Sequence, residues 1–124
     1  MTWLFIDTSR ADQFRVGYLG SKISVKTIQG RAQGLLVAIM RLPKMKMDGV
    51  CVVQGPGSFS AIRTGTLIAN LLSRLWKKSL VGVSVAESED LSALSEQLSQ
   101  KGVKSSTYVA PIYDAEPNIT VKVC

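Results

Sequence analysis

A glycine-rich turn between an apolar strand and a long amphipathic segment most constrains how this chain can fold. Residues 50–53 are all apolar, residues 54–58 read Gln-Gly-Pro-Gly-Ser, and apolar residues then recur at helical spacing to about residue 77. A strand, a tight turn and a helix N-terminus are therefore expected in direct succession. Such a junction directs backbone N–H groups outward and suits either an anion or a closely approaching backbone.

The same turn does not match the phosphate-binding motif of P-loop nucleotide hydrolases. That motif needs a lysine to reach the phosphates and a hydroxyl to bind magnesium, and neither stands at the required spacing. The alternative is structural, with Gly55 and Gly57 supplying unusual backbone angles around Pro56 and Ser58 capping the helix. Arg63, one turn into the helix, is placed to hold loop carbonyls or a carboxylate on a partner.

Composition excludes several classes of protein. The hydrophobic content of 46% is too high for a disordered chain, and the longest apolar run, residues 35–40, is too short to span a bilayer. Histidine is absent and the two cysteines form no CxxC pair, which argues against a Ser-His-Asp triad, a Cys-His pair and an ordinary zinc site. We expect one cytoplasmic domain, residues 1–124, with no signal peptide, membrane segment or metal. The net charge of +6 is assigned to solvated lysines, with nucleic-acid contact as the alternative.

Hydrophobic patterning predicts an α/β fold. Apolar runs at residues 3–6, 50–53 and 80–83 predict buried strands, and alternation at 14–20 and 21–28 predicts a hairpin. Helices are expected at about 30–42, 58–77 and 86–100, with final strands at about 108–113 and 119–123. The element order is βββαβαβα followed by a terminal β-hairpin, and the all-apolar strands imply a sheet covered on both faces.

Two of the helices carry more apolar surface than one sheet covers. On a helical wheel, the apolar residues between 62 and 76 span an arc of about 220°, whereas packing on one sheet needs about 100°. Residues 35–40 are apolar throughout. The excess is covered either by other elements of the same chain or by another subunit, and we favour the subunit interface. Gly65 and Ala69, four residues apart, would let a second helix approach closely.

The Asp7-Thr8-Ser9 segment ends the first predicted strand, where open α/β sheets often bind ligands. A carboxylate there would order a hydrated metal or a phosphate-contacting loop, and the alternative is an aspartate that caps a turn. With no paired carboxylates, no histidine and no loop lysine, the residues alone favour a binding or scaffold domain.

Three segments resemble the TsaB family, also called YeaZ. They are Ile-Asp-Thr-Ser at 6–9, Gln-Gly-Pro-Gly-Ser-Phe-Ser-Ala-Ile-Arg-Thr-Gly at 54–65 and Leu-Val-Gly-Val-Ser at 80–84. The family's usual signatures are an IDTS start, a GPGSFTGxRxG segment and a VGVSSLE-like strand exit. Their order and spacing agree over roughly residues 3–90, and residues 110–115 look like the family's strand ending in Asp-Ala-Arg.

The resemblance implies the N-terminal lobe of the actin-like ATPase (ASKHA, RNase H-like) fold. It also implies a non-catalytic scaffold that activates a TsaD-like partner, with a TsaE-like protein, in forming threonylcarbamoyladenosine on tRNA. The tRNA is then acted on indirectly, a homodimer forms in isolation, and ATP with magnesium is bound only in complex with partners. In the family the first two helices form the interface, and the corresponding residues here are Leu35, Leu36, Ile39, Met40, Ile62, Thr66, Ala69 and Leu72. Candidates for a ligand-binding or structural loop are Asp7, Thr8, Gly55, Gly57, Ser58 and Arg63.

The sequence also departs from the family pattern. Members are typically about twice as long, Ser60-Ala61 stands where Thr-Gly is usual, and residues 29–33 lack the usual acidic and histidine-bearing start of the first helix. With the second lobe largely absent, a two-lobed nucleotide cleft does not close within this chain, so ATP hydrolysis by it alone is not expected. A naturally minimal homologue and a fragment remain open alternatives. The competing function is a small nucleotide-binding, ATPase-like enzyme that uses Asp7 and the 55–57 loop.

Overall fold

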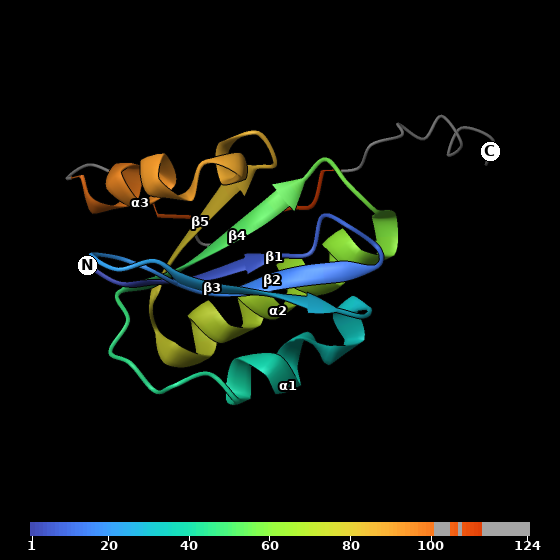
Figure 1. Ribbon diagram of the computed structural model, residues 1–124, viewed down its shortest axis with the longest axis horizontal. Coiled ribbons are helices and arrows are strands. Elements are labelled where there is room, and N and C mark those ends of the chain that lie inside the picture. Colours follow the sequence, from blue (N-terminus) through green and yellow to red (C-terminus); the bar gives the residue numbers. More distant parts are fainter. Residues whose placement is uncertain (101–104, 107, 113–124) are drawn as a thin grey trace.

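The computed structural model describes residues 1–100, 105–106 and 108–112. Three strands come first, then two α-helices that alternate with two strands, and then a third helix (Figure 1). Short 3-10 turns precede two of the helices. The elements are β1 (Trp3–Asp7), β2 (Gln13–Leu19), β3 (Ser24–Gln29), η1 (Ala32–Gly34), α1 (Leu35–Met40), β4 (Gly49–Gly55), α2 (Phe59–Trp76), β5 (Ser79–Ser84), η2 (Glu87–Glu89) and α3 (Leu91–Ser99).

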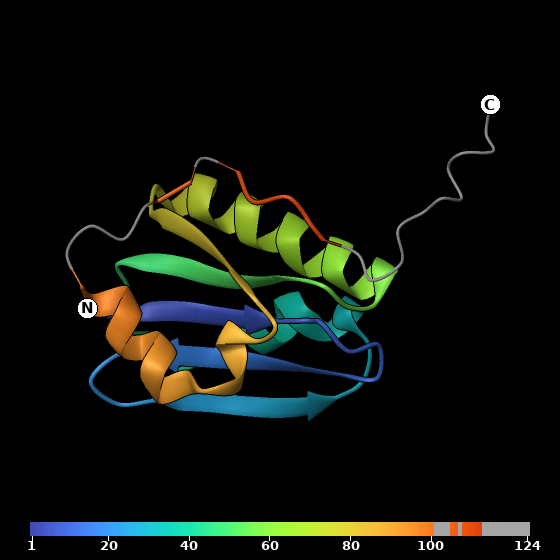
Figure 2. The same ribbon diagram turned by 90° about the horizontal axis from the view of Figure 1, so that it is seen from above.

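The five strands form one sheet in the order β3-β2-β1-β4-β5. The hairpin strands pair antiparallel, β1 with β2 and β2 with β3, while β1–β4 and β4–β5 are parallel. Helices α1 and α2 cover one face of the sheet and α3 covers the other (Figures 1 and 2). The described elements follow the α/β order βββαβαβα that was expected from the sequence.

Two apolar clusters form the core, one on each face of the sheet. Leu4 and Ile6 of β1 pack with α1 and α2, whereas Trp3 and Phe5 pack with α3. Successive side chains of a strand point to opposite faces, so a strand covered on both sides must be apolar throughout. This is why the uninterrupted apolar runs predicted the central strands correctly.

Two helices differ from their predicted extents. The helix expected from residue 30 begins as a 3-10 turn and is α-helical only from Leu35, because Gly30 has a positive φ of 132° and Gly34 stands at the N-cap. The helix expected at 86–100 is interrupted at Asp90, whose backbone is extended. The Asp90 carboxylate accepts a hydrogen bond from the Ala93 N–H at 3.1 Å and so starts α3 as an N-cap.

The terminal hairpin is not confirmed. Residues 108–112 do not form the predicted strand, and residue 113 and the strand expected at 119–123 lie outside the described residues. The described part of the segment runs beside α2 (Figure 2). Its backbone is bonded at separate points, with Ser106 N–H donating to the Leu80 carbonyl and Ile112 N–H donating to the Gln54 carbonyl, each at 2.6 Å. Pro111 lies between such bonds and has no N–H to contribute to a ladder.

Candidate functional site

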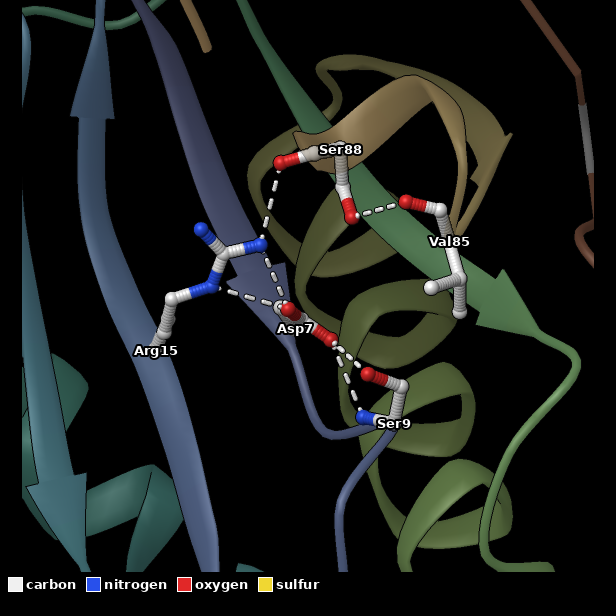
Figure 3. A network of polar contacts seen from close by, with 5 residues as sticks. All are labelled: Asp7, Ser9, Arg15, Val85 and Ser88. Carbon is white, nitrogen blue, oxygen red and sulfur yellow. Dashed lines mark hydrogen bonds and ion pairs between the residues drawn. The ribbon is translucent and has the colours of Figure 1, made fainter. Parts of the chain in front are cut away.

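The carboxylate of Asp7 is fully engaged by neighbouring side chains and backbone at the end of β1 (Figure 3). Its Oδ2 accepts hydrogen bonds from Nε and Nη2 of Arg15 at 2.9 and 2.7 Å, and its Oδ1 accepts from the N–H and hydroxyl of Ser9 at 3.0 and 2.7 Å. An ionised carboxylate offers about four acceptor positions, and these four bonds use them. The geometry therefore favours the structural alternative for Asp7 over metal or phosphate binding.

Arg15 is the residue that sequence reasoning missed at this site. It lies opposite Asp7 in the β1–β2 register, and its Nη2 also donates to the Ser88 carbonyl at 3.1 Å. The Ser88 hydroxyl in turn donates to the Val85 carbonyl at 2.7 Å, so Arg15 links β1 and β2 to the turn after β5. These residues come together only through the pairing register of β1 and β2. In the sequence, Asp7 and Arg15 flank one short connection between strands, which was a usable signal for an ion pair.

The glycine turn at residues 55–58 is filled by other parts of the chain. Gly55 has a positive φ of 121°, as the structural alternative expected, and a Cβ there would overlap the Ile112 carbonyl. A Cβ at Gly57 would overlap the Ser9 carbonyl, which also accepts a hydrogen bond from the Ser58 N–H at 3.0 Å. These glycines allow backbone segments to approach closely, and the Ser58 N–H at the start of α2 is already bonded to Ser9.

Thr8 fastens the end of β1 to α2. Its side chain is fully buried, and its hydroxyl donates to the Ala61 carbonyl at 2.7 Å. A Cβ at Gly65 would overlap the Thr8 hydroxyl. The close approach predicted at Gly65 therefore occurs inside the chain, between α2 and the end of β1. Gly65 and Ala69 are both buried within this chain, so this packing does not support the expectation that they admit a helix of another subunit.

Two further expectations for the start of α2 are corrected. Ser58 occupies the N-cap position, but within the described residues its side chain makes no capping hydrogen bond. The guanidinium of Arg63 lies over the Phe59 ring, 5.7 Å from its centroid, and the described contacts do not join it to loop carbonyls. Arg63 is exposed, so its side chain is available to a partner.

Most of the interface candidates lie in the chain's own core. Six of the eight are buried, and of this set only Leu36 and Met40 of α1 are exposed, at 44% and 75%. Since the buried six already contact the sheet or neighbouring core residues, a partner would reach them only by unpacking the fold. The six buried residues are Leu35, Ile39, Ile62, Thr66, Ala69 and Leu72.

A different part of the wide apolar arc faces outward. Leu67, Leu71 and Leu75 stand four residues apart on α2 and are 68%, 60% and 68% exposed. Residues at this spacing share one side of a helix. Together with Leu36 and Met40 they are called the apolar face below. The arc was recognised in the sequence, but which half of it packs on the sheet is decided by the tertiary fold.

Asn70 holds the segment after α3 against α2. Its Oδ1 accepts a hydrogen bond from the Val109 N–H at 2.9 Å, and its Nδ2 donates to the carbonyls of Val109 and Thr66 at 2.8 and 2.7 Å. Val109 is thereby buried in the core cluster on the α1 and α2 face. A lone amide within the otherwise apolar stretch of residues 67–72 was the sequence signal for this contact.

Groups that carry chemistry are sparse in the part of the chain that the structure describes. That part contains no cluster of three or more His, Cys, Asp or Glu side chains arranged to hold a metal. No described helix combines the length and apolarity needed to cross a membrane. Burial, with a smaller contribution from the charge of Glu87, raises the pKa of the Cys51 thiol to about 12, so this thiol is not an activated nucleophile.

Comparison with known proteins gives a family and a fold. The model of the TsaD family, described as tRNA N6-adenosine threonylcarbamoyltransferase, matches residues 31–116. YeaZ from Pseudomonas aeruginosa is similar in structure, with a TM-score of 0.60 and 21% identity over 71% of this chain and 47% of that chain. A further solved protein from Pseudomonas aeruginosa, described as uncharacterized with similarity to peptidase YEAZ, gives a TM-score of 0.52 and 20% identity over 70% and 46%. No curated protein sequence matches this chain significantly.

These matches confirm the resemblance to YeaZ over part of the chain. The chain spans about half the length of the two solved structures. At this identity the likeness concerns the fold, which is that of an actin-like lobe over the aligned region.

Proposed function

Because the chain belongs to the TsaD family, we propose that it is a TsaB-like, non-catalytic subunit in the threonylcarbamoylation of tRNA. It binds and activates a TsaD-like protein, acts with a TsaE-like protein, and affects tRNA indirectly through that complex. In isolation it forms a homodimer through the surface that binds the TsaD-like protein. It works in the cytoplasm and uses no cofactor of its own, with ATP and magnesium bound only in the complex.

The arrangement at the end of β1 supports a non-catalytic role. The Asp7 carboxylate accepts four hydrogen bonds from Arg15 and Ser9, and the glycine turn is packed against Ser9 and Ile112. A group that binds hydrated magnesium or activates water needs free lone pairs and an open approach. Neither is offered here, and no specific observation favours the alternative of a small ATPase-like enzyme.

The observation that carries the proposal is the apolar face. Its three α2 leucines are each at least 60% exposed, and burying one such side chain stabilises a complex by roughly 1.5–3 kcal/mol. Contiguous exposed leucines are uncommon on monomers and mark interaction sites. Arg63 and Arg74, both exposed on α2, add charges that favour carboxylates on the partner's rim.

Co-purification with the TsaD-like protein of the same genome tests this assignment. The double substitution Leu67→Asp with Leu71→Asp places two charges on the apolar face without disturbing buried residues, and we expect it to abolish the complex. Ile23→Asp is the control, because Ile23 is also an exposed apolar residue, at 41%, but lines a hollow beside α3. Undiminished binding by a folded double variant would contradict the assignment of the apolar face as the binding surface.

Calorimetry with ATP and magnesium separates the proposal from the nucleotide-enzyme alternative. We expect no binding heat from the isolated chain. Tight binding with turnover that disappears in Asp7→Ala would instead establish the enzyme and overturn the non-catalytic role.

A further inference from the structure

A second concave surface lies on another flank of α1, between that helix and the edge strand β3. It is a groove of about 630 Å³ whose lining includes the apolar residues Ile28, Val37 and Leu42. At about 100° per residue, Val37 and Arg41 share a flank of α1 that differs from the flank carrying Leu36 and Met40. The groove is therefore separate from the apolar face.

The strand beside the groove has an open edge. β3 ends the sheet, and its outer side pairs with no strand among the described residues. Lys26 and Ile28 are two residues apart and so lie on the same side of β3, and both line the groove. An extended segment added to this edge would form backbone hydrogen bonds with β3 and direct every second side chain toward the groove.

The rim of the groove is positively charged. Lys26, Arg31 and Arg41 line it and are exposed, and no aspartate or glutamate appears among its described lining residues. The two ion pairs found within the described residues join Arg10 to Asp12 and Arg15 to Asp7, so the three rim cations have no intramolecular carboxylate partner there. Apolar lining residues beside cations that have no carboxylate partner among the described residues are complementary to a ligand that carries both apolar groups and carboxylates.

We propose that this groove binds an extended, acidic peptide segment of a partner protein by strand addition to β3, with apolar residues at alternate positions entering the groove. RNA is a poorer match, because single-stranded RNA is held largely by bases stacking on exposed aromatic rings. The aromatic residue in the described lining, Phe14, is only 3% exposed and cannot offer its face to a base.

Fluorescence anisotropy with a labelled peptide tests this site. The probe alternates glutamate and valine over six residues, the length of β3, and a lysine–valine peptide of equal length is the charge control. We expect the acidic peptide to bind and the basic one not to bind. Arg31→Glu with Arg41→Glu should weaken the acidic peptide by at least about tenfold and allow the basic peptide to bind. Lys77→Glu with Lys78→Glu makes the same charge change at the end of α2 and should leave binding unchanged.

Three further measurements keep the result independent of variant folding and of the proposed function. An acidic peptide methylated on alternate backbone nitrogens should lose affinity, and NMR shifts of the wild-type chain should map to β3 and α1. The groove variant should still co-purify with the TsaD-like protein, because the apolar face is intact. Equal peptide binding by the groove variant, or binding of single-stranded oligouridine in place of the acidic peptide, would overturn the proposal.

Discussion

Asp7 and Arg15 face each other across β1 and β2, and one carboxylate oxygen of Asp7 accepts hydrogen bonds from both Nε and Nη2 of Arg15. From the sequence, Asp7 was considered as a ligand-binding carboxylate. In the structure its ion pair with Arg15 instead joins β1 to β2. Because Arg15 also donates to the Ser88 carbonyl, this ion pair connects β1 and β2 to the turn after β5.

Removing Arg15 should destabilise the fold strongly. Arg15→Ala leaves the Asp7 carboxylate, whose side chain is 9% exposed, without its counter-ion, and we expect a loss of about 3 kcal/mol in the free energy of unfolding. Urea denaturation measures it. Asp7→Asn combined with Arg15→Met removes both charges and should recover part of the loss. A change below about 1 kcal/mol in the single variant would contradict the structural role.

The contact between Thr8 and Gly65 should show strong coupling. Gly65→Ala places a methyl group on the Thr8 hydroxyl and should cost about 1–3 kcal/mol by overpacking. In the Thr8→Ala background the same substitution should cost less, because the hydroxyl and methyl groups that it meets are gone. Thermal unfolding of the four proteins gives the coupling. Additive effects would show that α2 does not approach β1 at this position.

Loss of the Asn70 amide should free the segment at Val109. Asn70→Ala removes two hydrogen bonds to that backbone and leaves its buried groups unpaired, at a cost of about 1–3 kcal/mol. Hydrogen exchange should become faster at the Val109 amide. The β1 amides should exchange faster only to the extent that the whole protein is less stable. Gln97→Ala, an exposed amide on α3, serves as the control. An unchanged exchange rate at the Val109 amide would contradict the role of Asn70 in holding this segment.

Cys51 should be inert in the folded protein and should make stability fall at high pH. Its pKa is about 12 in the fold against an ordinary value of 9.0, so the folded state holds the proton more tightly. The associated stability is present below pH 9.0 and is lost as pH rises through about 12. In a Cys124→Ser background, a thiol reagent at pH 8 should react only after unfolding. Cys51→Val should show a shallower decline of stability with pH, and equal slopes would contradict the assignment.

The sequence predicted much of the fold because its central strands are buried on both faces. Short apolar runs such as residues 50–53 are typical of such strands, and the glycine turn marks where β4 ends and α2 begins. The surface was harder to predict. The wheel of α2 gave an arc wider than one interface, and only packing on β4 and β1 shows that Ala69 turns inward while Leu67 and Leu71 turn outward.

Contacts between distant residues also escaped prediction. Arg15 gains its role from the β1–β2 register, and Asn70 gains its role from a segment about forty residues later in the chain. The extended backbone at Asp90 divided one expected helix, although aspartate three residues before a helix N–H was a recognisable cap. Local patterning therefore located the elements, whereas side-chain roles depended on pairing and packing.

The central claim is that the apolar face of α1 and α2 binds a TsaD-like protein. The most direct test is the mass, by light scattering, of a mixture of this chain with the TsaD-like protein of the same genome. The account predicts a complex of both proteins with the wild-type chain, and separate components when Leu67→Asp and Leu71→Asp are present in a chain that still folds. A complex of unchanged mass and affinity with that double variant would contradict it.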